Sequence, residues 1–426
     1  MIKLLVIADD FTGALDTGVQ FVSDEAATEV LTNPVYDFSR IDPDVQTLVL
    51  NAETRHLPAD KAYDIIYRIV AAAKTAAIPY IYIKTDSALR GNIGSELAAA
   101  MDASGIRQLP FIPAFPATNR ITREGIHYID GIPVAESVFG RDPFDPVRNS
   151  SVNTIIAQET DKPVENLQRN QPADPKAEGI LVYDAESEED LNRIGRELGS
   201  SGLRLSAGCA GFAAVLKDLF GLKKTVPALS RLEPALLAVC GSINPISLRQ
   251  LTYAQQHGFL RITLDEACKS QMDWTRTPAG KAQLQGWLRQ LRQSSRVVFD
   301  TADTAQQSSM LSRYVPPLSS RQLGIQIAAI LSEVVKYMLD SGIQATLMCI
   351  GGDTLKAITR TLGVSQIIPV CEVEKGVVLA RFVYQDRTYH IITKSGGFGD
   401  QDLLCRIADY TETNSLQSGE RNVSSI

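Results

Sequence analysis

The sequence predicts an α/β protein of two lobes, each with a mainly parallel sheet flanked by helices, and a cleft between the lobes. Three observations support this prediction. Short apolar runs alternate with helical patterns, which is typical of parallel sheets. The alternation stops at one stretch rich in Pro, Gly and Lys and then starts again. The chain has 426 residues, which suits two or three hydrophobic cores rather than one.

In the first half, short apolar runs predict strands, and longer segments with Ala, Leu and Ile at helical spacing predict helices. Two β-like runs around Asp130-Gly131 predict a hairpin over 125–135, because Asp-Gly is a strong turn signal. The segment 142–176 is rich in Pro, Asn, Asp and Gln, and we expect an irregular excursion or lid there. The predicted strands are 3–8, 47–52, 79–84, 109–113 and 179–184, and the predicted helices are 58–77 and 92–103.

The pattern breaks at "GLKKTVPALSRLEP" (221–234), where we place the domain boundary. The predicted domains are 1–228 and 229–412, followed by a polar, frayed tail at 413–426. The second domain repeats the α/β alternation and ends in a hairpin around Gln385-Asp386. Its predicted strands are 236–240, 260–264, 296–300, 346–350, 377–384 and 388–393, and its long predicted helix is 321–340.

The charge of the chain narrows the class of partner. The formal net charge is −7, and no Lys/Arg cluster forms a stripe, so we expect neither nucleic acid nor a membrane surface as a partner. A small anionic substrate is compatible with this charge, since a few local cations outweigh an acidic surface.

The cysteines and the N-terminus predict a cytoplasmic protein. Six cysteines are scattered singly with no C-x-x-C motif, which argues against a zinc site or a disulfide framework. The N-terminal apolar run is too short for a signal peptide, and we expect no stretch near the ~18 apolar residues of a membrane span.

The first apolar run, "LLVIA", ends directly on Asp9 and Asp10, and two interpretations stay open. A carboxylate after a strand often caps the next helix, where the helix dipole favours negative charge. Carboxylates at a strand end also bind sugar hydroxyls or Mg²⁺, which prefers oxygen ligands. Because side chains alternate along a strand, we expect one of the two to face a ligand.

A denser group of charged residues lies in "IKTDSALRGNIGSEL" (83–97). Lys84 and Arg90 are suited to bind a carboxylate or a phosphoryl group, and Asp86 is suited to accept a hydroxyl proton. Arg55 adds a cation at another strand end. The simpler alternative is a helix cap with solvated surface cations. The nearby "PAFPATNR" (113–120) is interpreted as a rigid structural loop.

Three glycine loops each follow a predicted strand of the second half. Small residues there let backbone N–H groups approach phosphate oxygens, and the next helix N-terminus adds positive potential. One such loop is usually a turn, but three in one domain favour a phosphate site. The chain has neither G-x-x-x-x-G-K-[ST] nor G-x-G-x-x-G, so the site is not of those types. The loops are 241–244, 351–354 and 396–399.

Together these stretches resemble the four-carbon acid sugar kinase family, and most closely its members that act on D-threonate. Ala88 stands where the family often has Thr, Asn119 where Gly is common, and "EVEKG" (372–376) where a Pro-Gly segment is usual. The matching segments follow the family order from residue 8 to residue 400 and are "ADDFTGALDTG", "KTDSALRGNIG", "PAFPATNR…G…YIDGIPVAES", "CGSINPIS…Q", "GGDT" and "KSGGFGD".

The resemblance implies ATP-dependent phosphorylation of the terminal (C4) hydroxyl of a four-carbon sugar acid, with ATP and Mg²⁺ as cofactors. D-threonate is the first expectation, and D-erythronate and 3-oxo-tetronate are the alternatives. The N-terminal domain would hold the sugar acid and the C-terminal domain ATP. The implied substrate-binding residues are Asp9, Asp10, Arg55, Lys84, Thr85, Asp86 and Ser87, and the implied nucleotide-binding residues are Ser242, Gly351, Gly352, Asp353, Thr354 and Gly397.

The residues suggest a division of roles in catalysis. Lys84 or Arg55 would anchor the substrate carboxylate. Asp86, or as second choice Asp353, would orient or deprotonate the attacking hydroxyl, and Arg90 would stabilise the transferring phosphoryl group. The metal ligands and the oligomeric state stay open, and a homo-oligomer is possible.

Two functions of other classes stay in view. The first is a Mg²⁺-dependent hydrolase or aldolase that uses no ATP. The second is a non-enzymatic sugar-acid sensor, which would have no use for three phosphate-type loops.

Overall fold

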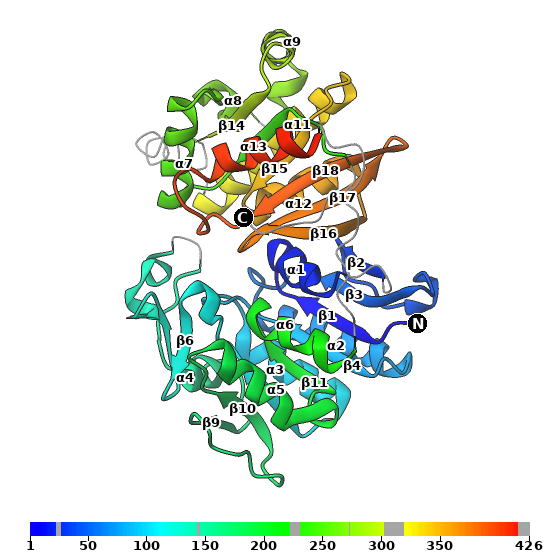
Figure 1. Cartoon of the computed structure of the whole chain (residues 1–426), viewed down its shortest axis with the longest axis vertical. Helices are drawn as coiled ribbons and strands as arrows, with labels where there is room; N and C mark the ends of the chain where they lie inside the picture. The colour runs from blue at the N-terminus through cyan, green and yellow to red at the C-terminus, as the bar shows by residue number, and fades with distance from the viewer. Residues whose placement is uncertain (23–26, 143–144, 222–230, 272, 302–318, 416–426) are drawn as a thin grey trace. The chain divides into compact units, whose positions relative to one another are not determined.

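The computed structural model describes residues 1–22, 27–142, 145–221, 231–271, 273–301 and 319–415. The chain divides into two compact units, which Figure 1 labels element by element. Unit 1 contains Met1–Pro227 and Gln366–Pro369, and unit 2 contains Ala228–Ser365 and Val370–Ile426. The sequence-based boundary after residue 228 and the last part of the predicted tail, 416–426, lie outside the described residues.

Unit 1 is built on a parallel sheet. Its strand order is β2-β3-β1-β4-β11-β5-β10-β9, and the start of β16 joins β2 at the edge as an antiparallel strand. The five strands predicted in this half are present, and β2, β9 and β11 were not predicted. The strands are β1 (Leu4–Ala8), β2 (Ala27–Leu31), β3 (Val45–Asn51), β4 (Tyr80–Lys84), β5 (Gln108–Ile112), β9 (Val164–Leu167), β10 (Gly179–Tyr183) and β11 (Leu205–Gly208).

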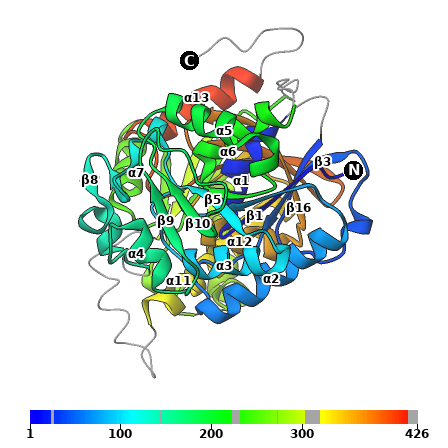
Figure 2. The same ribbon diagram turned by 90° about the horizontal axis from the view of Figure 1, so that it is seen from below.

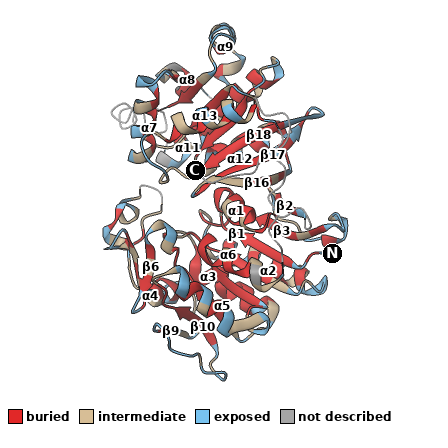
Figure 3. Ribbon diagram, viewed as in Figure 1, coloured by how far each residue is buried: buried red, intermediate tan, exposed pale blue. Residues whose placement is uncertain are grey.

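Helices cover both faces of this sheet. Figure 2 shows α2 and α3 on one side of the strands and α1, α5 and α6 on the other. The main core lies between α2, α3 and the sheet, where buried residues such as Ile69, Leu97 and Ile83 gather. The buried colour in Figure 3 follows these strands. The helices are α1 (Phe11–Gly18), α2 (Ala59–Thr75), α3 (Ile93–Ser104), α4 (Val152–Ala157), α5 (Glu188–Gly202) and α6 (Ala210–Leu219).

A small antiparallel sheet follows β5. It consists of β6 (Arg120–Arg123), β7 (Ile126–Ile129) and β8 (Ile132–Pro133). The predicted hairpin turn is present, with Asp130 and Gly131 both at positive φ. The segment 142–176 is less irregular than expected, because it contains α4 and the edge strand β9, which pairs with β10.

Unit 2 has a mixed sheet in the order β13-β14-β12-β15-β18-β17-β16. The strands from β13 to β18 in this order run parallel, and β17 pairs antiparallel with β18 across the turn Gln385-Asp386. The strands are β12 (Leu236–Cys240), β13 (Leu260–Thr263), β14 (Arg296–Asp300), β15 (Thr346–Ile350), β16 (Gln366–Glu374), β17 (Val377–Tyr384) and β18 (Arg387–Lys394). The predicted α/β class with mainly parallel sheets flanked by helices is therefore confirmed.

The core of unit 2 packs α7 and α13 against β12 through residues such as Leu251, Leu404 and Ala238. In α13 the helix continues to Ser415, past the predicted tail start. The helices are α7 (Pro245–Gln256), α8 (Glu266–Ser270), α9 (Pro278–Leu291), α11 (Ser320–Asp340), α12 (Gly352–Leu362) and α13 (Leu403–Ser415).

Helix α11 corrects the expectation that the chain has no apolar stretch of the length of a membrane span. Within the parts of the chain that the structure describes, its stretch Arg321–Asp340 is long and apolar enough to cross a membrane by length and composition. Most of that stretch, 61%, is buried inside the protein, as in the core helix of a globular unit.

Candidate active site

The predicted substrate-binding residues of unit 1 follow three neighbouring parallel strands. Ala8, the last residue of β1, is paired with Asn51 at the end of β3 and with Lys84 at the end of β4. The carboxyl ends of these strands therefore meet at one edge of the sheet, where α/β proteins bind ligands. Asp9 and Asp10, Arg55, and the 84–87 stretch all lie in the loops that start there.

The Arg55 guanidinium lies at the centre of this group. Its Nε and Nη2 donate to the two carboxylate oxygens of Asp9 at 2.7 and 2.9 Å. Its Nη1 lies 2.8 Å from Oδ2 of Asp10, and its Nη2 lies 3.5 Å from Oδ1 of Asp86. Burial alone would lower the pKa of Arg55, but the three carboxylates outweigh burial and raise it well above its ordinary value.

Both members of the opening Asp pair therefore contact the same cation. Side-chain alternation does not separate them, because both follow Ala8, the last residue of the strand. Asp10 also caps α1, since its Oδ1 accepts from the N–H of Gly13 at 2.9 Å. Burial raises the pKa of Asp9 despite the charge of Arg55, whereas the charges of Arg55 and Lys84 outweigh burial and lower the pKa of Asp10.

Asp86 lies between two guanidinium groups. Arg90 donates to it through Nε at 2.8 Å and Nη2 at 3.1 Å, and Nη1 of Arg90 reaches Asp142 at 3.2 Å. Burial alone would raise the pKa of Asp86, but the charges of Arg90 and Arg55 hold it well below its usual range. Leu89, at φ 62°, closes the loop in the left-handed region, which a Leu adopts only when its surroundings impose it.

Lys84 is buried in the same group, and its Nζ donates to the carbonyl of Thr85 at 2.8 Å. A Cβ at Gly13 would lie 2.5 Å from Oδ1 of Asp10 and 2.6 Å from Nζ of Lys84, so only glycine leaves both groups in place. Thr85 is turned toward the next strand, since its N–H donates to the carbonyl of Gly208 at 2.8 Å.

The structure adds a residue that the sequence interpretation missed. Arg120, the last residue of "PAFPATNR", is buried and its Nη1 donates to the hydroxyl of Ser87. His127 contacts the carbonyl of Ser87 through Nε2 at 3.0 Å, and burial lowers its pKa to about 4. This loop is therefore part of the charged group and not only a rigid connection. The signal in the sequence that could have indicated this role is the one cation of the loop, Arg120.

The three glycine loops of unit 2 also meet at strand ends. Cys240 of β12 is paired with Ile350 of β15, and Ile350 with Lys394 of β18. A Cβ at Gly241 would lie 2.2 Å from Oγ1 of Thr354, and a Cβ at Gly396 would lie 2.3 Å from Oγ of Ser242. Such close approach leaves room for no side chain, which is the arrangement that backbone phosphate binding uses.

Two helices begin at these loops. Asn244 caps α7 by accepting from the N–H of Ile246 at 2.9 Å. Helix α12 begins at Gly352 after Gly351, which adopts φ 108° and makes no side-chain cap. The first N–H groups of α12 therefore lack a side-chain capping partner and are suited to an anion. Asp353 is exposed in this first turn.

The third loop is held from behind by Gln250 of α7. Its amide donates to the carbonyls of Phe398, Gly399 and Asp400 at 2.8–3.0 Å. Its Oε1 accepts from Nζ of Lys394 at 2.9 Å. Lys394 is buried, and burial lowers its pKa to about 8. Both residues lie in segments quoted for the family resemblance, "CGSINPIS…Q" and "KSGGFGD", but the sequence interpretation gave neither a role.

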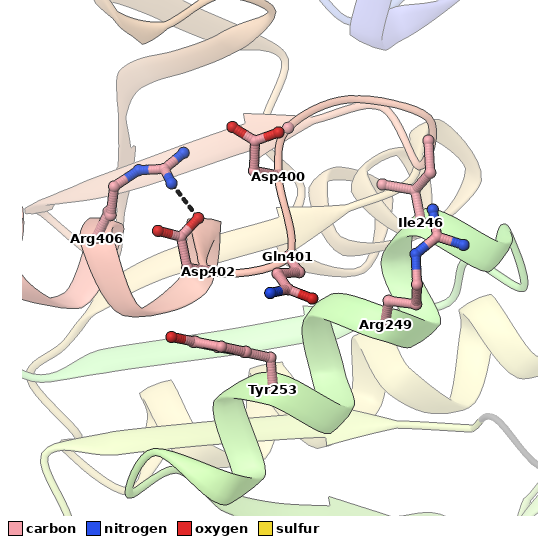
Figure 4. A pocket seen from close by; sticks show the side chains of 8 residues that line it. Ile246, Arg249, Tyr253, Asp400, Gln401, Asp402 and Arg406 are labelled. Atoms are coloured by element: carbon pink, nitrogen blue, oxygen red, sulfur yellow. Dashed lines mark hydrogen bonds and ion pairs between the residues drawn. The ribbon is translucent and has the colours of Figure 1, made fainter.

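A polar hollow of about 660 Å³ adjoins this loop (Figure 4). Arg249 and Tyr253 from α7 line one part of it, and Asp400 and Arg406 line another. None of the six predicted nucleotide-binding residues is among the residues that line it.

The described residues contain no group of three His, Cys, Asp or Glu side chains that could hold a metal ion. Asp9 and Asp10 are bound to Arg55, so their oxygens do not fit a magnesium site made by the protein alone. Mg²⁺ more often binds one or two carboxylates together with substrate phosphates. The glycine loops and the exposed Asp353 fit that arrangement.

Comparison with known proteins identifies both units. Residues 4–216 match a family described as a sugar-binding N-terminal domain, and residues 237–404 match one described as a nucleotide-binding C-terminal domain. The fold is similar to solved structures from Salmonella typhimurium (TM-score 0.76, 21% identity, 96% of this chain and 99% of that one) and Haemophilus influenzae (TM-score 0.70, 18% identity, 97% and 100%).

Curated relatives match nearly the whole chain. A D-threonate kinase of Salmonella typhimurium is 30% identical, covering 96% of this chain and 98% of the relative. A D-threonate kinase of Bordetella bronchiseptica is 29% identical (95% and 96%), and a D-erythronate kinase of Heliobacterium modesticaldum is 26% identical (97% and 98%). The chain therefore belongs to the four-carbon acid sugar kinase family and is a sugar-acid kinase, a phosphotransferase with an alcohol group as acceptor.

Proposed function

We propose that the protein uses ATP to phosphorylate the terminal C4 hydroxyl of D-threonate, giving D-threonate 4-phosphate. The observation that carries the proposal is the group of Lys84, Arg55, Arg90 and three aspartates at the strand ends of unit 1, which offers cations for a carboxylate and carboxylate oxygens for hydroxyl groups. The two D-threonate kinases among the relatives support this substrate. D-erythronate and 3-oxo-tetronate are the alternatives that other relatives suggest.

Unit 1 is proposed to hold the sugar acid. Lys84 is the better anchor for the substrate carboxylate, because the guanidinium of Arg55 is already bound by three carboxylates of the protein. Arg55 would then fix the positions of Asp9 and Asp10. The remaining lone pairs of their carboxylates would accept hydrogen bonds from the substrate hydroxyls. Ser87 adds a neutral hydroxyl at the same place.

Asp86 is proposed to orient the attacking hydroxyl. Its low pKa makes it a weak proton acceptor early in the reaction. Phosphoryl transfer proceeds through a loose transition state in which alignment matters more than early deprotonation, so an orienting carboxylate is sufficient. Arg90 holds Asp86 through two hydrogen bonds and supplies positive charge beside it. Asp353 is the second candidate to orient the attacking hydroxyl.

Unit 2 is proposed to bind ATP through Ser242, the 351–354 loop and Gly397. Backbone N–H groups there and the N-terminus of α12 would contact the phosphates. Mg²⁺ would arrive with ATP and neutralise phosphate charge, with Asp353 as the carboxylate placed to contact it. The small-molecule substrates and the six free thiols support a cytoplasmic location.

The test is ATP consumption measured across a panel of four-carbon sugar acids: D-threonate, D-erythronate, L-threonate and 3-oxo-tetronate. D-threonate is expected to give the highest kcat/KM, and the product is expected to carry phosphate on C4 by phosphorus and carbon NMR. If another acid is preferred, the proposed substrate changes but the proposed reaction, phosphorylation by ATP, does not. Conversion of an acid without ATP consumption would favour the hydrolase or aldolase, and binding without conversion would favour the sensor.

A further inference from the structure

Two side chains of α7 hold the backbone of the third glycine loop. Oγ of Ser247 donates to the carbonyl of Gly396 at 2.9 Å. Nε2 of Gln250 donates to the carbonyls of residues 398–400 at 2.8–3.0 Å. Ser247 and Gln250 are three residues apart, so they lie on one face of the helix, and both are fully buried. Four carbonyls of the segment 396–400 are therefore turned toward α7.

The direction of these carbonyls fixes the direction of the N–H groups that follow them. In a trans peptide the C=O of one residue and the N–H of the next residue point in opposite directions. The N–H groups of Gly397, Gly399 and Asp400 each follow a held carbonyl, so they point away from α7. Among the residues that the structure describes, none accepts a hydrogen bond from these three N–H groups. Because Gly396 closely approaches Ser242, these donors belong to the same cluster of strand-end loops.

Lys394 determines which way the amide of Gln250 faces. It is the last residue of β18, is 1% exposed, and donates from Nζ to Oε1 of Gln250 at 2.9 Å. An ammonium group can only donate and a loop carbonyl can only accept, so the NH2 end of the amide has to face the loop. Burial lowers the pKa of Lys394 to about 8, so the side chain is still mostly protonated at pH 7.

Successive backbone N–H groups on one side of a loop are donors that proteins use to bind phosphate. We propose that Ser247, Gln250 and Lys394 are positioning residues for the phosphates of ATP. Ser247 and Gln250 hold the loop carbonyls toward α7, so that the N–H groups on the other side face the nucleotide. Lys394 keeps the amide of Gln250 in the orientation that this requires. The inference rests on the proposed function, in which unit 2 binds ATP.

The test measures, by calorimetry, the Kd of ATP and of inorganic tripolyphosphate, each with Mg²⁺, for the wild type and Gln250→Met, which keeps the length of the side chain. The variant is expected to bind both ligands about 10- to 100-fold more weakly, because the loop carbonyls lose their donor and no longer fix the N–H groups. Its Kd for D-threonate, which unit 1 is proposed to bind, is expected to equal that of the wild type. The matched control is Gln255→Met on the same helix, where the side chain is exposed, and it is expected to leave all three values unchanged.

Further variants separate the three roles. Ser247→Ala removes the donor to one carbonyl and is expected to weaken both phosphate ligands about 3- to 10-fold. Lys394→Met is expected to weaken them because the amide of Gln250 can then turn over. The double variant of Gln250→Met with Lys394→Met is expected to bind them no more weakly than Gln250→Met alone. It also serves if a single variant does not fold, since replacing both partners of a buried hydrogen bond by apolar groups costs little stability.

Wild-type affinity for both phosphate ligands in Gln250→Met or in the double variant, even with a lowered melting temperature, would mean that these side chains only pack α7 against the loop, and would overturn the inference. A double variant that binds more weakly than Gln250→Met would mean that Lys394 acts on the phosphates directly and not through Gln250. A loss for ATP without a loss for tripolyphosphate would also overturn the inference. A wild type that binds ATP and tripolyphosphate but phosphorylates no sugar acid would refute the proposed function, and the same titrations would still decide this inference.

Discussion

The guanidinium of Arg55 joins Asp9, Asp10 and Asp86, which come from two different strand ends. Both Arg55 and Asp9 are buried, so neither charge is well solvated. Removing one partner of a buried ion pair leaves the other uncompensated, which costs more than the pair itself contributes. This arginine therefore acts on the stability of unit 1 as well as on its proposed chemistry.

Arg55→Ala is expected to lower the free energy of unfolding by about 3–5 kcal/mol and the melting temperature by roughly 10 °C, measured by thermal unfolding without ligand. Arg107→Ala is the control, because its side chain is 79% exposed and its pair with Glu178 is solvated. The control is expected to change stability by less than ~0.5 kcal/mol. Equal effects in the two variants would contradict this account of the buried group.

Glu96 on α3 predicts a pH dependence. Burial, and then the charge of Asp9, raises its pKa from 4.5 to about 8. Between these values the folded state binds more protons than the unfolded state, so this group's contribution to stability falls as pH rises. Glu96→Gln removes the titration. The melting temperature of the variant minus that of the wild type is expected to increase steadily from pH 5 to pH 8.

The control for this prediction is Glu165→Gln on the edge strand β9, where the side chain is exposed. Its difference from the wild type is expected to stay constant over the same pH range. A Glu96→Gln difference that is also constant would mean that Glu96 is ionised in the folded protein near neutral pH.

At the scale of elements, each proposed binding site consists of loops that follow adjacent parallel strands. Parallel pairing puts the loops after β3, β1 and β4 at one edge, and does the same for β12, β15 and β18. A loop can contribute its backbone N–H groups to such a binding site only if the neighbouring loops can approach it closely. The glycines of unit 2 serve this requirement, because Cβ atoms at Gly241 and Gly396 would meet Thr354 and Ser242.

Gly241→Ala is expected to weaken ATP binding at least 10-fold, because its Cβ would push Thr354 and the start of α12 out of place. Calorimetric titration with ATP and Mg²⁺ measures the change. The matched control is Gly324→Ala on α11, where a Cβ would meet nothing within 4 Å. The control is expected to keep the ATP affinity and to gain about 0.5–1 kcal/mol of stability, since alanine favours a helix. Unchanged ATP binding in Gly241→Ala would remove this loop from the proposed nucleotide site.

Local sequence signals were sufficient for most elements. The run "LLVIA" is apolar throughout, and "TLMCI" is apolar after its Thr, because both faces of these strands are buried. The turn at Asp130-Gly131 was found because Asp and Gly tolerate positive φ, and the turn at Gln385-Asp386 because β-like runs flank it on both sides. Strand β11 was missed because "LSAG" is short and has little β-propensity, and its place between β4 and β5 comes from pairing with distant strands.

At the scale of the whole molecule, the two units are proposed to bind different substrates. A ligand that binds only the folded state stabilises it by an amount that grows with the logarithm of the ligand concentration over Kd, about 2.7 kcal/mol at 100 times Kd. Each substrate should therefore stabilise the protein in the absence of the other, and variants of one unit should affect one ligand.

Lys84→Met is expected to abolish the rise in melting temperature caused by D-threonate and to retain the rise caused by ATP with Mg²⁺. Gly241→Ala is expected to show the opposite pattern. Differential scanning fluorimetry with each ligand alone measures both. Loss of both responses in either folded variant would contradict the division of binding between the units.

The sequence by itself determined the α/β class, most strands and helices, and the charged and glycine-rich segments, because apolar periodicity, turn residues and short motifs are local properties. It also contained the resemblance that the relatives confirm. Only the tertiary structure decided how the charges pair. Arg55 forms ion pairs with three carboxylates, two of which are those of Asp9 and Asp10. Arg120 contacts Ser87 from a loop that is distant in the sequence. These contacts depend on which strands lie side by side and on how deeply the charges are buried, and a linear sequence reveals neither. Burial matters because it strengthens the interactions between charges.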